Sequence, residues 1–168
     1  DLYADAIINL QASPAITSQL VSNSGTISAD GGQITLTAAA GAQEVNSLIN
    51  MDGVIQADSI GTRNGEITLY AEGSNAVTGN ITDNKNQKTG VSTVLVSGVL
   101  DASGYGSGEK GGNINVLADH VGILSGAKID ASGDTGGGNS KIGGDFHGAG
   151  TTPTALATIV QSGAVISA

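Results

Sequence analysis

The sequence of 168 residues contains no cysteine and no tryptophan, and only four of its residues are aromatic. Without cysteine the chain can form neither a disulfide framework nor a zinc–thiolate site. Because aromatic side chains normally supply much of the buried area of a compact globule, a core here must be built from isoleucine, leucine, valine and alanine. Glycine, in contrast, accounts for 27 residues, which is about twice its average share.

Basic residues are also scarce. Six lysines and arginines stand against 15 acidic residues, and the net charge is −9. Binding to nucleic acid needs basic side chains that neutralise phosphates, so we expect no nucleic-acid partner and no charge-driven binding to an anionic membrane. No apolar run approaches the roughly 20 residues of a transmembrane helix, so we expect no membrane insertion.

What the sequence does contain is a short phrase written five times. It reads "SGTISADGG" from Ser24, "DGVIQAD" from Asp52, "SGVLDASG" from Ser97, "SGAKIDASG" from Ser125 and "SGAVISA" from Ser162. The phrases align on five turn glycines, which are Gly25, Gly53, Gly98, Gly126 and Gly163. Internal repeats at such spacings are the signature of solenoid architectures.

Each phrase has an aliphatic residue, one polar residue and then alanine. This alternation predicts a short strand with one buried face. The predicted inward column consists of the pairs Ile27/Ala29, Ile55/Ala57, Leu100/Ala102, Ile129/Ala131 and Ile166/Ala168. The outward residues between them are Ser28, Gln56, Asp101, Asp130 and Ser167.

Two further apolar segments complete each repeat. "GGQITLTA", "NGEITLYA" and "GGNINVLA" predict a second strand, and runs such as "STVLVSG" and "ATIVQSG" predict a third. Three short strands per repeat predict an all-β chain folded as a right-handed parallel β-helix of about five to six coils, in which stacking buries a continuous column. A β-sandwich also has alternating strands, but it has no reason to reuse the same residue types at fixed positions.

The repeat is interrupted twice. The longer spacings coincide with polar stretches, which predict loop insertions at residues 73–90 and 143–155. Insertions in solenoids map to loops while the core continues. We therefore expect residues 1–168 to form a single β-helix segment.

Nearly the whole chain resembles the filamentous haemagglutinin-like exoproteins of Gram-negative two-partner secretion. The resemblance rests on "VSNSGTISADGGQITLTA", "RNGEITLYA" and above all "GAKIDASGDTGGG" with "IGGDFHG". It implies a segment of the β-helix shaft of a very long secreted adhesin, located on the cell surface or outside the cell. It further implies an outer-membrane partner transporter, attachment to a host, neighbouring cell or matrix through other parts of the chain, and no cofactor or catalytic residue in the shaft.

Three aspartates beside glycine-rich turns suggest a rival function. Paired carboxylates hydrolyse glycosidic bonds, and Asp101 and Asp130 are expected on adjacent coils, with Asp145 further along the chain. However, serine or glutamine fills the equivalent outward position in other repeats, so we expect these acids to be solvated surface groups of a protein that is not an enzyme. The two histidines, His120 and His147, are isolated in the sequence.

Two glycine-rich stretches are similar to ligand-binding loops, but neither has the required spacing. "GGGNSKIGGD" (residues 136–145) lacks the tandem pattern of a calcium-binding nonapeptide. "GSGEKGG" (residues 106–112) lacks the hydroxyl residue and the helix that follow the lysine of a phosphate loop. We expect both to be turns, with no metal and no cofactor.

The two ends of the sequence lack a recognisable cap. The chain opens on "AIINLQA" and closes on "SGAVISA", and neither stretch predicts a capping helix or a polar outer coil. An open coil exposes unpaired backbone edges. We therefore expect the solenoid to continue, either within a longer chain or through a second copy stacked end to end.

Overall fold

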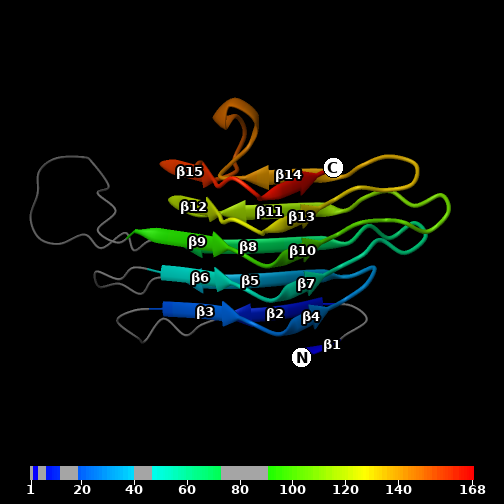
Figure 1. The fold of residues 1–168 in the computed structure, drawn as a ribbon, viewed down its shortest axis with the longest axis horizontal. Coiled ribbons are helices and arrows are strands. Elements are labelled where there is room, and N and C mark those ends of the chain that lie inside the picture. Colours follow the sequence, from blue (N-terminus) through cyan, green and yellow to red (C-terminus); the bar gives the residue numbers. More distant parts are fainter. Residues whose placement is uncertain (1, 4–6, 12–18, 40–46, 73–90) are drawn as a thin grey trace, which may run out of the picture.

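The computed structural model describes residues 2–3, 7–11, 19–39, 47–72 and 91–168. Its strands form three parallel sheets in which every third strand is a neighbour (Figure 1). This confirms the prediction of an all-β chain built from repeated strands. The only helix of the described residues is the short 3-10 helix η1 (Phe146–Gly148), and none of them forms a helix that could span a membrane.

Sheet A holds the five strands that follow the turn glycines and, at one edge, a short strand at the start of the chain. In spatial order they are β1 (Leu2–Tyr3), β4 (Thr26–Ser28), β7 (Val54–Gln56), β10 (Val99–Asp101), β13 (Lys128–Asp130) and β16 (Val165–Ser167). The register pairs Ile27 with Ile55, Ile55 with Leu100, Leu100 with Ile129, and Ile129 with Ile166. The aliphatic residues of the five phrases therefore form one column in one sheet.

Sheet B contains the longer strands. They are β2 (Ile7–Gln11), β5 (Gln33–Ala39), β8 (Glu66–Glu72), β11 (Asn113–Leu117) and β14 (Asn139–Ile142). Here Ile34, Ile67 and Ile114 occupy one register position, and Leu36, Leu69 and Val116 occupy another. Amides and hydroxyls alternate with them on the outer face, where Asn115 Nδ2 donates to Thr68 Oγ1 at 3.2 Å.

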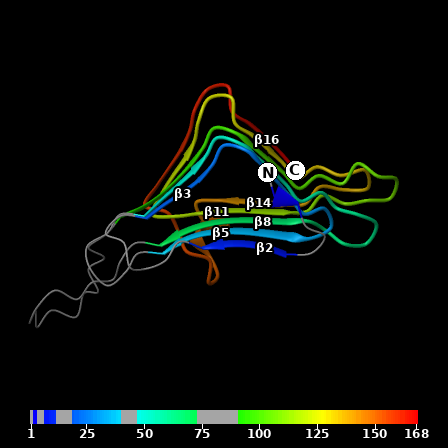
Figure 2. The same ribbon diagram turned by 90° about the horizontal axis from the view of Figure 1, so that it is seen from below.

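Sheet C completes each repeat. Its strands are β3 (Gln19–Asn23), β6 (Ser47–Met51), β9 (Ser92–Val96), β12 (His120–Ile123) and β15 (Ala157–Val160). Seen from below, the three sheets form the sides of a triangle (Figure 2). Each repeat contributes one strand to each side, and we call one such set of three strands a level.

The core fills the inside of the triangle. It is a single cluster of aliphatic and alanine side chains with one methionine, Met51, and it contains no aromatic residue among the described side chains. Ala29, Ala57, Ala102 and Ala131 are fully buried where sheet A turns toward sheet B. Stacking of like residues from level to level thus replaces the aromatic packing of a globule.

The last level departs from the predicted burial. Ile166 occupies the inward register position of β16 but is 43 % exposed, whereas Ile129 on the level before is fully buried. Ala168 is likewise exposed. The reason is that β16 is an edge strand of sheet A, so its inward side chains have neighbours on one side only.

The turn glycines are required for two different reasons. A β-carbon on Gly53 would overlap the carbonyl oxygen of Gly25, and one on Gly98 would overlap that of Gly53. A β-carbon on Gly126 would meet no atom, and one on Gly163 would lie 3.0 Å from the Ser125 side-chain oxygen, but the φ angles of these glycines are +87° and +90°, where a side chain is strained. Close stacking therefore selects glycine on the early levels and backbone conformation selects it on the later ones.

Only one of the two predicted loop insertions lies among the described residues. Residues 73–90 lie outside the described residues. Residues 143–156 leave the stack between β14 and β15 and carry η1, projecting past the last level in Figure 1.

A buried polar pair closes the corner between sheets B and C. Asp119 Oδ2 accepts hydrogen bonds from the backbone N–H and the hydroxyl of Ser92, at 3.1 Å and 2.9 Å. In return, Ser92 Oγ accepts from the Asp119 N–H at 2.8 Å. Both residues are buried, so this pair satisfies polar groups that would otherwise be costly at the corner.

Candidate functional site

A row of acidic side chains lies at the outer edge of sheet A, where the chain turns toward sheet B. One register position holds Ser28, Gln56, Asp101, Asp130 and Ser167. Two residues further along the chain, just beyond the strand ends, come Asp30, Asp58, Ser103 and Ser132. Four consecutive levels thus each carry one aspartate, and we call Asp30, Asp58, Asp101 and Asp130 the corner carboxylates.

On each level the aspartate is bonded to the residue two positions away. Gln56 Nε2 donates to Asp58 Oδ2 at 2.6 Å, and Ser28 Oγ donates to Asp30 Oδ1 at 3.3 Å. On the later levels the order is reversed, because the acid comes first and Ser103 N donates to Asp101 Oδ1 at 3.0 Å. Residues i and i+2 of a strand point to the same side, which is why this pairing recurs.

Asp130 is not the solvated group that we expected from the sequence. It is only 3 % exposed, because Tyr105 from the loop after β10 reaches across and donates its hydroxyl to Asp130 Oδ2 at 2.9 Å. Lys128 Nζ lies 3.0 Å from the same oxygen, and both the N–H and the hydroxyl of Ser132 donate to Oδ1. The expectation of simple surface solvation is therefore wrong for Asp130.

The environment of Asp130 strongly favours its charged form. Burial alone would raise its pKa, but the hydrogen bonds from Ser132, Lys128 and Tyr105 outweigh it and hold the pKa at about 2. In turn, the hydrogen bond and the charge of Asp130 raise the pKa of Lys128. A carboxylate held ionised by four donors is poorly suited to act as a general acid.

Asp58 has the opposite electrostatic character. Burial raises its pKa to about 6, and the neighbouring carboxylates of Asp101 and Asp30 add to that increase, while the hydrogen bond from Gln56 opposes it. The sequence analysis does not predict a role for Asp58, because in the phrase "DGVIQAD" the predicted strand ends at Ala57 and Asp58 lies beyond it. The recurring polar residues at i and i+2 were the available signal.

The loops that continue from these strands are held together by their own acids. Glu109 accepts hydrogen bonds from the backbone N–H groups of Gly61 and Gly106, both at 2.8 Å. Asp134 accepts from Gly108 N at 2.9 Å. The stretch that is similar to a phosphate loop therefore uses two of its backbone donors for carboxylates of the chain itself, and it is a turn.

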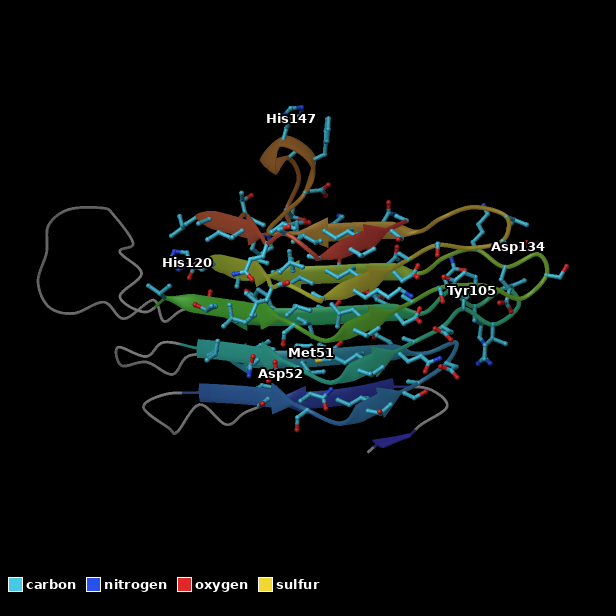
Figure 3. All side chains as sticks on the ribbon, in the orientation of Figure 1. Met51, Asp52, Tyr105, His120, Asp134 and His147 are labelled. Carbon is cyan, nitrogen blue, oxygen red and sulfur yellow. The ribbon has the colours of Figure 1, made fainter. Side chains whose placement is uncertain are left out.

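Asp145 lies away from the corner carboxylates. It follows β14 and caps η1 by accepting from Phe146 N at 2.8 Å, and it pairs with Lys141 at 2.7 Å. The hydrogen bond from Lys141 and that from Phe146 lower the pKa of Asp145. Figure 3 shows His147, His120 and the pair Tyr105 and Asp134 at three separate places, so the two histidines lie apart from each other. Of the three predicted acids, Asp101 and Asp130 are register neighbours.

Among the described side chains, no group of three or more histidine, aspartate or glutamate residues is placed to hold a metal ion. The arrangement at the corner is instead a ladder of hydrogen-bonded carboxylates that runs along the stack. No protein-family model, no curated protein and no solved structure matches the chain.

Proposed function

We propose that this chain is a segment of a right-handed parallel β-helix that serves as a rod in a large secreted adhesin or extracellular filament of a Gram-negative bacterium. One observation carries the proposal: the inward position of sheet A is filled by isoleucine or leucine from β4 through β16 without a break in register. Such a column can be extended by adding levels, each about 4.8 Å long.

A mechanical role agrees with how the side chains are used. The polar groups at the corners bond to neighbouring levels of the same chain, as Ser92 does with Asp119 and Glu109 with Gly61. The sequence resemblance described above supplies the biological setting: export through a partner transporter in the outer membrane, and attachment to a cell or matrix through other parts of the parent chain.

The first test uses the native source. Mass spectrometry of surface and secreted fractions is expected to find these peptides within a much larger chain. Removal of residues 98–125 from the parent takes out one strand of each sheet, namely β10, β11 and β12, and joins Ser97 to Gly126. Because a rod tolerates shortening by one level, adhesion should survive. A cytoplasmic chain, or adhesion abolished by this deletion despite normal export, would contradict the proposal.

A polysaccharide-cleaving enzyme is the rival that can be tested directly. Asp101 and Asp130 are neighbours in the register, but Asp130 is covered by Tyr105 and held by Lys128. We therefore expect no cleavage of a uronate polymer by the chain. Cleavage that is lost in Asp101→Asn would establish the enzyme instead.

End-to-end association of copies is a second candidate, in which the last level of one copy would stack on the first level of the next. Val160 and Ile166 are 53 % and 43 % exposed at register positions whose partners Ile123 and Ile129 are fully buried. If copies stack, the sedimentation coefficient should rise with concentration. Ile166→Asp should abolish that rise, while Val165→Asp, on the outward side of the same strand, should not. A sedimentation coefficient independent of concentration would exclude stacking.

A further inference from the structure

Asp58 and Asp101 occupy successive levels at the outer corner. Asp58 Oδ2 accepts from Gln56, but Asp58 Oδ1 is buried and has no hydrogen-bond partner among the described residues. Ser103, which follows Asp101 at the register position of Asp58, is 1 % exposed, and its hydroxyl oxygen is likewise buried without a partner. A buried oxygen without a donor is costly, most of all when it carries charge.

The charged groups around Asp58 offer no compensation. On the level before lies Asp30 and on the level after lies Asp101, and both are carboxylates that oppose its ionisation. The next level brings Asp130, whose charge is already paired with Lys128.

The neighbouring turns do not supply a cation either. Arg63 packs over Gly31, and Glu109 of the next loop binds Gly61 N. Within the described part of the chain, no ion pair involves Asp58 or Asp101.

We propose that Asp58 takes up a proton on its buried Oδ1 in mildly acidic solution, so that the stacking of β7 on β10 is stronger there than in neutral or alkaline solution. The proton removes the charge from a buried oxygen that has no hydrogen-bond partner among the described residues. It also removes the repulsion between Asp58 and the carboxylates on the levels before and after it.

The pKa of Asp58, which burial and the adjacent carboxylates raise to about 6, supports the proposal and sets the pH range. A group whose pKa is higher in the folded than in the unfolded chain adds stability below its unfolded pKa, and that stability is lost as the pH rises through the folded value. The chain should therefore lose stability between pH 5 and pH 7.5. Asp130 acts in the opposite direction, but only below its unfolded pKa near 4, outside this range.

The test is the melting temperature of the 168-residue chain between pH 5 and pH 7.5. We expect the wild type to melt about 2–4 °C lower at pH 7.5 than at pH 5, as follows from about 1 kcal/mol in a domain of this size. Asp58→Asn should remove this difference and raise the melting temperature at pH 7.5, because the amide can still accept from Gln56 and carries no charge at any pH. Asp134→Asn, which removes one charge from an exposed loop, is the matched control and should leave the pH dependence unchanged.

Carbon-13 NMR of the aspartate carboxyl groups gives a second readout that does not depend on stability. One carboxyl group should titrate near pH 6, and that step should vanish in Asp58→Asn but remain in Asp134→Asn. Titration of Asp58 below pH 4.5 would overturn the proposal. So would a calcium-dependent rise in melting temperature at pH 7.5 that Asp58→Asn removes, since Asp58 would then belong to a cation site.

Discussion

Gly98 lies against Gly53 on the preceding level so closely that a β-carbon on Gly98 would overlap the carbonyl oxygen of Gly53. At this point the two levels are joined by the hydrogen bond that Val99 N donates to Gly53 O, at 2.9 Å. The turn that begins each phrase thus sets how tightly one level approaches the next. Glycine at this position is part of the stacking geometry as well as of the turn.

Substitutions of these glycines should distinguish the two reasons for glycine at this position, which are the close approach of two levels and a positive φ angle. Gly98→Ala forces backbone atoms apart and should cost more than about 2 kcal/mol, the scale on which overpacking destabilises a core. Gly126→Ala meets no neighbour and should cost about 1 kcal/mol from its positive φ. Asparagine tolerates positive φ, so Gly126→Asn should be milder than Gly126→Ala, while Gly98→Asn should be no milder than Gly98→Ala. Urea denaturation measures the free energy of unfolding of all four variants. If asparagine were milder than alanine by the same amount at both positions, the two glycines would not be required for different reasons.

The inward column should show a graded dependence on level. Ile55 is fully buried, so Ile55→Ala should lower the free energy of unfolding by about 2–5 kcal/mol, as for other large-to-small core substitutions. Ile166 has the same residue type and the same register position but is 43 % exposed. In the 168-residue chain, Ile166→Ala should therefore cost less than about 1 kcal/mol. Equal losses would show that the last level is covered in solution.

Charge in the alanine corner should not be tolerated. Ala57 is fully buried where sheet A turns toward sheet B, so Ala57→Asp places a carboxylate in an apolar corner without a partner and should cost several kcal/mol, on the order of 3–5. Thr35→Asp adds the same charge on the outer face of sheet B and should change stability by less than about 1 kcal/mol. An unchanged melting temperature in Ala57→Asp would rule out the dry corner.

The Ser92 and Asp119 pair should contribute more than a surface hydroxyl. Ser92→Ala removes two of the hydrogen bonds that join these buried residues and should cost about 1–3 kcal/mol. Ser97→Ala is the control, because the Ser97 hydroxyl bonds to the exposed Asp52, and it should cost less than about 0.5 kcal/mol. Thermal unfolding of both variants under one set of conditions measures the difference.

Below pH 4 the direction of the pH dependence should reverse. The pKa of Asp130 is held at about 2 by its donors, below the unfolded value near 4. A group with a lowered pKa contributes stability above its unfolded pKa and loses it as the pH falls through the folded value. Melting temperatures measured from pH 4.5 down to pH 2 should fall, and Asp130→Asn should flatten that fall. If the melting temperature of Asp130→Asn fell just as steeply, groups other than Asp130 would be responsible for the loss of stability in acid.

Much of the repeat architecture follows from the sequence alone. Alternating aliphatic and polar residues define strands with an inward face, and the same residue types at the same distance from a glycine define which strands are neighbours. Ile55 could be matched with Leu100 in this way across 45 residues, because stacking places equivalent side chains next to each other and a slip of one residue would turn the inward set outward.

The tertiary structure decided what the repeats do not encode. The path of the loop after β10 brings Tyr105 over Asp130, and loop paths have no periodicity from which they can be predicted. The raised pKa of Asp58 depends on which levels are adjacent, because the carboxylates of Asp30 and Asp101 lie on the levels before and after it. The exposure of Ile166 depends on its edge position. Sequence therefore determined the inward face and the register, which rest on local alternation and like-with-like stacking, whereas burial and charge at the outer corner depend on neighbours that only the folded chain brings together.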